Sequence, residues 1–147
     1  MPQDLPHDFT HDLTEWTDMV AFVKYLGIKI SEVTAEHVKG EVLIRPELTN
    51  HLPNAHGGVF MSFADALGAF GAQYHLPEGA EGTTTIESKT NFLRSAQEGD
   101  TLHGVCKPLN VGRRLSVWQT DITRGDGKLA AQVTQTQIYL WPLGENA

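Results

Sequence analysis

The segment NAHGGVFMSFAD, residues 54–65, combines residue types that could act on a carbonyl group. Asn54 is a good N-cap, which would place Gly57 and Gly58 in the first turn of a helix. First-turn N–H groups have no partner inside the helix and lie at its positive end, and glycines leave them open to a ligand's oxygen. The pattern therefore indicates an oxyanion-stabilising site, although a turn of purely steric purpose fits these two glycines equally well.

One carboxylate, Asp65, stands in the otherwise apolar stretch that follows. A carboxylate on a buried helix is unfavourable unless it is paired, hydrogen-bonded or protonated. Such a group could act as a general base or a nucleophile, and the structural alternative is an aspartate that receives hydrogen bonds from threonine or backbone donors.

The spacing of Gly57 and Asp65 has a consequence for assembly. They are eight residues apart, which is about 12 Å along a helix. A reacting carbonyl must lie within about 3–3.5 Å of both its attacker and its oxyanion donors. If both groups act on one carbonyl, they must come from two chains. We therefore expect at least a dimer, with its sites at the subunit interface.

The elements that would position these residues follow an α+β pattern. Helical spacing of apolar residues from Thr14, a cap, to Gly27, a stop, predicts an N-terminal helix. Alternation over residues 28–47 predicts a hairpin that turns near Thr34–Glu36, and the helix that carries Asp65 should run to about His75. Four strand-like segments come next, at residues 83–96, 100–110, 114–124 and 128–141. We expect an antiparallel sheet packed on the long helix.

The long helix is apolar nearly all round, which is typical of a helix buried on most sides. Glycine inside a helix costs roughly 1 kcal/mol relative to alanine. Gly68 and Gly71 therefore indicate that another backbone approaches closely, either from a tightly curled sheet or from a partner's helix.

Composition limits the class of protein. The chain has 147 residues, 40% of them hydrophobic, and a net charge of −7, which argues against nucleic acid as the main partner. No apolar run is long enough to span a membrane, and the first residues lack the layout of a signal peptide. A single cysteine, Cys106, favours a reducing, cytoplasmic location. We expect residues 1–13 to be a flexible tail and residues 14–147 to form one domain.

Basic residues gather in the second half of the chain and could hold phosphates, although a solvated strand face fits them equally well. They are Lys89, Arg94, Lys107, Arg113 and Arg114.

A family resemblance covers the same residues. Hotdog-fold acyl-CoA thioesterases carry an Asn or Gln six residues before a His-Gly-Gly triplet, and an Asp or Glu nine residues after its His. The chain is similar at NHLPNAHGGVFMSFADALGAFGA, where these positions hold Asn50, His56, Gly57, Gly58 and Asp65. Residues 91–122 resemble the same family, notably its phenylacetate-degradation-type members and the dihydroxynaphthoyl-CoA thioesterases. The likeness covers roughly residues 27–141.

The resemblance implies a hotdog fold, in which a curved antiparallel sheet wraps round one long central helix, here with an extra N-terminal helix. It also implies assembly into dimers and often tetramers.

The implied activity is hydrolysis of an acyl-CoA thioester to free acid and coenzyme A. Asp65 would act as general base or nucleophile, and the Gly57 N–H of the facing subunit would polarise the carbonyl with help from His56. Asn50 would orient the lytic water or the leaving group. Coenzyme A belongs to the substrate, and neither a separate cofactor nor a metal ion is expected. The contacts to coenzyme A would come from Gly58, Arg94, Arg113 and Arg114.

The sequence departs from some relatives at two points. Asp65 pairs with Asn50 where the relatives closest to the later segment use Glu with Gln, so the pairing looks more like the phenylacetate-type branch. Ala69 stands where some relatives place a Ser or Thr four residues after the carboxylate. We expect a threonine of the next strand to replace that hydroxyl in trans, with Thr85 favoured over Thr83 and Thr84.

Two alternatives stay open. Hotdog hydratases and dehydratases pair a His with a carboxylate about fourteen positions on, and His51 precedes Asp65 by fourteen. A non-catalytic acyl-CoA binding module would keep the pocket without turnover. The acyl group is not specified by the sequence.

Overall fold

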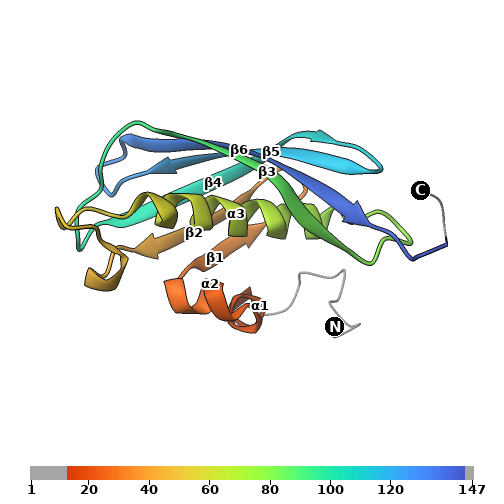
Figure 1. The fold of residues 1–147 in the computed structure, drawn as a ribbon, viewed down its shortest axis with the longest axis horizontal. Helices are drawn as coiled ribbons and strands as arrows, with labels where there is room; N and C mark the ends of the chain where they lie inside the picture. Colours follow the sequence, from red (N-terminus) through yellow and green to blue (C-terminus); the bar gives the residue numbers. More distant parts are fainter. Residues whose placement is uncertain (1–12, 145–147) are drawn as a thin grey trace.

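The computed structural model describes residues 13–144, whose six antiparallel strands form one sheet that curves round a single long helix (Figure 1). The long helix is α3, Gly57–Tyr74. The strands are β1 Lys29–Val33, β2 Val38–Leu43, β3 Gly82–Phe92, β4 Thr101–Val111, β5 Leu115–Thr123 and β6 Leu129–Leu140. Their order across the sheet is β1-β2-β4-β5-β6-β3, so β1 and β3 are its edges. This is the α+β arrangement that the sequence predicts.

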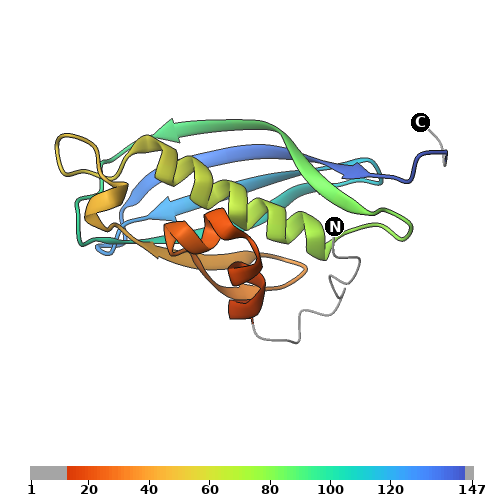
Figure 2. The same ribbon diagram turned by 60° about the horizontal axis from the view of Figure 1, so that its bottom comes forward.

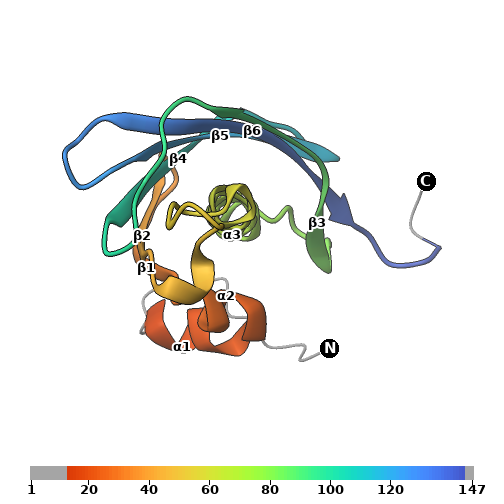
Figure 3. The same ribbon diagram turned by 60° about the vertical axis from the view of Figure 1, so that its left-hand side comes forward.

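The concave face of the sheet and α3 share one apolar core. Seen along the helix, the sheet arches over α3, and β3 descends beside it at one edge (Figure 3). Burial alternates along β5 and β6, as it should in strands that bury one face. Phe63 and Leu67 of α3, together with Trp118 and Ile122 of β5, have no exposed surface.

Two helical glycines let the sheet come close to α3. A Cβ added to Gly68 would lie 2.4 Å from the side-chain amide of Gln135 on β6, and one added to Gly71 would lie 2.6 Å from the ring of Trp118. The expected close approach is therefore present and comes from the sheet. Its atoms belong to side chains of β5 and β6 rather than to another backbone.

The N-terminal segment differs from the single helix that the apolar spacing predicts. It forms two short helices, α1 Leu13–Met19 and α2 Ala21–Leu26, because Val20 between them is extended, with φ −97° and ψ 98°. The break lets Trp16 on α1 and Val23 on α2 both reach the core. Gly27 ends α2 in the left-handed region at φ 75°, as predicted. Both helices lie on the side of α3 away from β5 and β6 (Figure 2).

The two termini and the first hairpin complete the outline. The predicted tail falls outside the described residues except for Leu13, which begins α1. The hairpin of β1 and β2 turns at residues 34–37, where the Thr34 hydroxyl oxygen accepts the N–H groups of Glu36 and His37. Within residues 13–144, no helix has the length and apolar character needed to cross a membrane.

Candidate active site

The start of α3 is capped by a histidine. The residue type of Asn54 suggests an N-cap, but Asn54 does not cap the helix, because its backbone is held in a bridge with Gln97. His56 is the N-cap instead, and its Nδ1 accepts the Gly58 N–H at 3.0 Å. A nitrogen that accepts a hydrogen bond carries no proton, so the neutral ring holds its proton on Nε2. The exposed His56 ring therefore presents an N–H donor beside the helix start.

Only one of the two paired glycines keeps an open donor. The Gly58 N–H is taken by His56. Gly57 is the first residue of α3, and within residues 13–144 no acceptor meets its N–H. A Cβ at Gly57 would lie 3.4 Å from the Phe92 ring, which is ordinary contact, so crowding does not explain the glycine. The Gly57 N–H is thus an unpaired donor at the positive end of a helix of 18 residues.

Asp65 lies on the more open side of α3 and is only half-buried in the single chain, whereas the sequence predicts a buried carboxylate. Its Oδ1 accepts the Thr85 hydroxyl at 2.6 Å. Among the described residues, no side chain or N–H group bonds to Oδ2. The favoured threonine is therefore the one that meets Asp65, but it does so from β3 of the same chain and not in trans. The hydrogen bond from a threonine that the structural alternative expects is thus present. It occupies only Oδ1, so Oδ2 can still act as a base or a nucleophile.

Sequence reasoning missed the residue behind Thr85. Gln137 on β6 is directly opposite Thr85 in the β3–β6 register and has no exposed surface. Its Nε2 donates to Thr85 Oγ1 at 2.6 Å, while its Oε1 accepts the Thr83 hydroxyl at 3.2 Å. The signal in the sequence is the pair Gln135 and Gln137, which occupy two inward-facing positions of a strand, where apolar residues are expected.

Asn50 lies in the loop before α3, where its side-chain oxygen is already in use. Its Oδ1 accepts the N–H of Leu52 at 2.8 Å and that of Asn54 at 3.4 Å. The Nδ2 amide is the part of Asn50 that remains available, so it can act on a ligand only as a donor.

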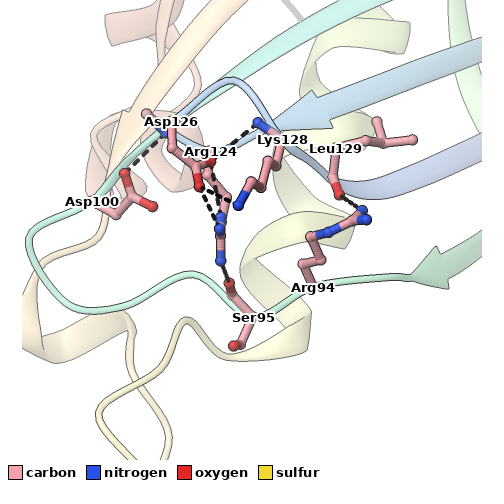
Figure 4. Close-up of polar contacts among 8 residues, drawn as sticks. Arg94, Ser95, Asp100, Arg124, Asp126, Lys128 and Leu129 are labelled. Atoms are coloured by element: carbon pink, nitrogen blue, oxygen red, sulfur yellow. Dashed lines mark hydrogen bonds and ion pairs between the residues drawn. The ribbon is translucent and has the colours of Figure 1, made fainter.

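The basic residues do not form one cluster. Arg94 lies near the start of α3, because the chain beyond β3 bonds to the segment before the helix through Ala55 N–H and Ala96 O at 2.7 Å. Its guanidinium is exposed and donates to Leu129 O at 2.7 Å (Figure 4). Arg113 and Arg114 are exposed in the β4–β5 turn, at the opposite end of the sheet, and Arg113 lies 5.5 Å over the Trp141 ring.

A neighbouring hollow holds a cation that is already neutralised. It is lined by Ser95, Gln97, Glu98, Asp100, Arg124 and Asp126. Arg124 binds both carboxylate oxygens of Asp126 (Figure 4). This guanidinium lowers the pKa of Asp126 to about 2. The charge of Arg124 is therefore paired with Asp126, and Arg94 is the better candidate to bind an anion at this end of the sheet.

The structure brings some predicted residues together and leaves others apart. Thr85 contacts Asp65, while His56, Gly57 and Asn50 gather at the start of α3, eight residues away along the same helix. His51 is exposed in the loop and makes no hydrogen bond with Asp65. Within residues 13–144, no three His, Cys, Asp or Glu side chains are grouped to hold a metal ion.

Comparison with known proteins identifies the family of this chain. Residues 52–131 match the model of the thioesterase superfamily. The 1,4-dihydroxy-2-naphthoyl-CoA hydrolase of Escherichia coli K12 is 30% identical over 118 residues, which cover 80% of this chain and 85% of that protein.

Two solved structures share the fold. A thioesterase from Haemophilus influenzae superposes with a TM-score of 0.83 at 24% identity, over 94% of this chain and 96% of its own. The PaaI protein of the phenylacetic acid degradation operon of E. coli superposes with a TM-score of 0.78 at 21% identity, over 86% of this chain and 89% of its own. These likenesses establish the fold, which is the hotdog fold that the sequence resemblance implies. The family match covers the capped glycine turn, Asp65 and Thr85, and by it the chain belongs to the thioesterase superfamily.

Proposed function

We propose that this protein hydrolyses an acyl-CoA thioester, with Asp65 of one protomer and the Gly57 N–H of a second protomer acting on the same carbonyl group. One observation carries the proposal. The half-buried Asp65 has one oxygen held by Thr85 and the other without a partner in the described chain, on the same helix whose first N–H also lacks an acceptor. The naphthoyl-CoA hydrolase relative supports coenzyme A as the leaving group.

The proposed site needs a second chain because α3 separates its two halves. Gly57 and Asp65 belong to one helix, and eight residues of helix separate them by about 12 Å. Met61 lies midway between them and is 41% exposed. A two-fold axis near Met61 would place two α3 helices antiparallel, with Gly57 of each beside Asp65 of the other.

The exposed surface of the chain supports such a pairing. Strand β3 has 11 residues and pairs only with β6 among the described strands, so its outer edge offers unpaired backbone groups. Long free edges of this kind invite pairing with another chain. On β3, Ile86 is 57% exposed and Phe92 is 54% exposed, although both are large and apolar. Pairing β3 with β3 of a second copy would cover the edge and make one continuous sheet.

The chemistry follows from the groups that meet at this interface. The Gly57 N–H and the His56 Nε2–H are donors that can stabilise negative charge on the thioester oxygen. Asp65 Oδ2 is free either to take a proton from water as it attacks, or to attack the carbonyl carbon itself. If water attacks, its oxygen becomes part of the acid; if Asp65 attacks, the anhydride that forms between Asp65 and the acyl group is then hydrolysed by water. In both routes the C–S bond breaks, one water molecule is consumed, and the coenzyme A thiolate takes up a proton to leave as the thiol. The Asn50 amide can donate to the water or to the leaving group.

Contacts to the coenzyme A phosphates would come from both ends of the site. Arg94 lies near the start of α3, while Arg113 and Arg114 lie at the far end of the sheet. In an antiparallel pair of helices, the Arg94 end of one protomer faces the second half of its partner, on the side of the partner's β4–β5 turn. This arrangement would give two sources of positive charge along one extended ligand.

The experiment is a thiol-release assay across a panel of aromatic, medium-chain and short-chain acyl-CoA esters. We expect at least one ester to be hydrolysed, and Asp65→Asn to lose at least ~10²-fold in kcat, the lower range for removal of a general base. Asp121→Asn is the matched control, because Asp121 is also half-buried and hydrogen-bonded, to Gln132 at 2.9 Å, but lies on β5 away from the site.

The outcomes separate the functions that the sequence leaves open. An Asp65→Asn protein as active as Asp121→Asn would refute the role of Asp65. Binding of acyl-CoA without thiol release would indicate a binding module. Conversion of an enoyl-CoA to its hydroxyacyl form without thiol release would indicate a hydratase.

A further inference from the structure

The side chain behind Asp65 is a polar group in a place where the fold needs an apolar one. Gln137 has no exposed surface and points from β6 into the core beneath the concave face of the sheet. A buried amide is unfavourable unless both its oxygen and its nitrogen find partners. Gln137 has both, and its two partners are threonines of β3, Thr83 and Thr85.

The hydrogen bonds in this group run in one direction. The Thr83 hydroxyl has two acceptors for its one proton, Gln137 Oε1 at 3.2 Å and the Ile138 carbonyl oxygen at 3.1 Å. Gln137 Nε2 then donates to Thr85 Oγ1 at 2.6 Å. Because Thr85 has a single hydroxyl proton, and its oxygen already accepts from Gln137, that proton is directed to Asp65 Oδ1, also at 2.6 Å.

The orientation of the Gln137 amide therefore controls what Asp65 receives. If the amide turned over, its oxygen would face Thr85, and the Thr85 proton would have an acceptor other than Asp65. Asp65 opposes that turn, because its Oδ1 and the amide oxygen would then compete for the single Thr85 proton. The strand register holds the side chain of Gln137 beside that of Thr85, since the two residues are direct partners across β3 and β6.

We propose that Gln137 is a positioning residue for the hydrolytic reaction, which fixes the Thr85 proton on Asp65 Oδ1 and so leaves Asp65 Oδ2 as the atom that acts on water or substrate. This inference rests on the proposed function of Asp65. It adds a residue that does not touch the substrate and acts only through Thr85. The Thr83 hydroxyl is the donor that the amide oxygen meets on its other side.

The test is a double-mutant cycle in the thiol-release assay. Gln137→Met keeps the approximate size of the side chain and removes both amide groups, and Thr85→Val removes the hydroxyl. We expect each to lower kcat by about tenfold or more, the effect of losing one hydrogen bond to a charged group, with KM changed less than about twofold. We expect the double variant to match Thr85→Val, because Gln137 acts through Thr85.

Gln135→Met is the matched control. Gln135 lies two residues earlier on the same face of β6 and is 1% exposed. It packs against Gly68 of α3, and its one hydrogen bond to the helix goes to the Asp65 backbone oxygen, at 3.5 Å. We expect its kcat to stay within about threefold of wild type, because its side chain bonds neither to Thr85 nor to the carboxylate of Asp65. Thermal unfolding of all variants measures any loss of fold. If Gln137→Met does not fold, Thr83→Val is the second test. Thr83 is only half-buried, and its loss leaves the amide oxygen of Gln137 without a donor among the described residues, so the amide is held less firmly against Thr85.

The results distinguish failure of this inference from failure of the proposed function. Losses that multiply in the double variant, or an equal loss in Gln135→Met, would overturn the positioning role while Asp65→Asn still abolishes activity. If Gln137→Met does not fold and Thr83→Val is measured in its place, an unchanged kcat in Thr83→Val would overturn the positioning role of Gln137. A wild-type protein that hydrolyses no ester, or an active Asp65→Asn, would overturn the proposed function and this inference together.

Discussion

Gly57→Pro is the most selective way to remove the proposed oxyanion donor. Proline has no N–H, and Gly57 is the first residue of α3, the position at which helices favour proline. The residue before proline must be extended, and His56 already is, with φ −63° and ψ 140°. No hydrogen bond within the described chain is lost, because none accepts the Gly57 N–H.

The expected magnitudes differ for folding and for catalysis. The nearest atom to a Cβ at Gly57 is 3.4 Å away, so the ring of Phe92 tolerates it. Stability should stay level or rise by up to about 1 kcal/mol, since proline and alanine both restrict the unfolded chain. The loss of one oxyanion donor should lower kcat about 10²–10³-fold, equivalent to about 2.7–4 kcal/mol of transition-state stabilisation.

Gly57→Ala is the matched control, because it adds the Cβ and keeps the N–H. The assay is steady-state thiol release for both variants, with thermal unfolding and sedimentation to verify fold and assembly. Gly57→Ala should retain clearly more activity than Gly57→Pro, because it keeps the N–H. If Gly57→Pro folds, assembles and turns over as fast as Gly57→Ala, the N–H does not stabilise the transition state and the reasoning is refuted.

Three further predictions concern binding, packing and the thiol. Arg94→Ala should raise KM for acyl-CoA about tenfold with little change in kcat, and should leave an acyl-pantetheine ester that lacks the nucleotide phosphates unaffected; equal effects on both esters would exclude a phosphate contact. Gly71→Ala places a Cβ 2.6 Å from Trp118 and should cost about 1–3 kcal/mol of unfolding free energy. In the Gly82→Ala control the new Cβ meets nothing closer than 3.9 Å, so the unfolding free energy should change little. Equal melting temperatures of Gly71→Ala and Gly82→Ala would contradict the packing of Gly71 against Trp118. Burial raises the pKa of the Cys106 thiol to about 12, so an aromatic disulfide reagent at pH 8 should find no thiol until the chain unfolds; rapid reaction of the native protein would contradict it.

The order of the elements could be predicted because each carries its own local pattern. Alternating burial on β5 and β6 matches the alternating sequence, and the apolar run with internal glycines becomes the central helix. The break at Val20 could not be predicted, since helical spacing continues through it and only tertiary packing decides where the chain bends.

The candidate site was predictable in residue types but not in contacts. Asp65 and the glycine turn stand out because they contradict the character of the helix that holds them. Residue type favours Asn54 as the cap, but the bridge to Gln97 overrides that preference, and His56 takes the position. Gln137 joins Asp65 only through the register of β3 and β6, 52 residues apart from Thr85 in the chain, and local sequence carries no information about that pairing.

The central claim is that each site uses Asp65 from one chain and Gly57 from another, and mixed dimers test it most directly. Asp65→Asn and Gly57→Pro proteins should each be nearly inactive alone. Unfolded together and refolded in equal amounts, they should form mixed dimers as half of the population, each with one site that has both groups intact, and recover about a quarter of wild-type activity. A mixture that contains mixed dimers and stays as inactive as its two components would contradict the claim.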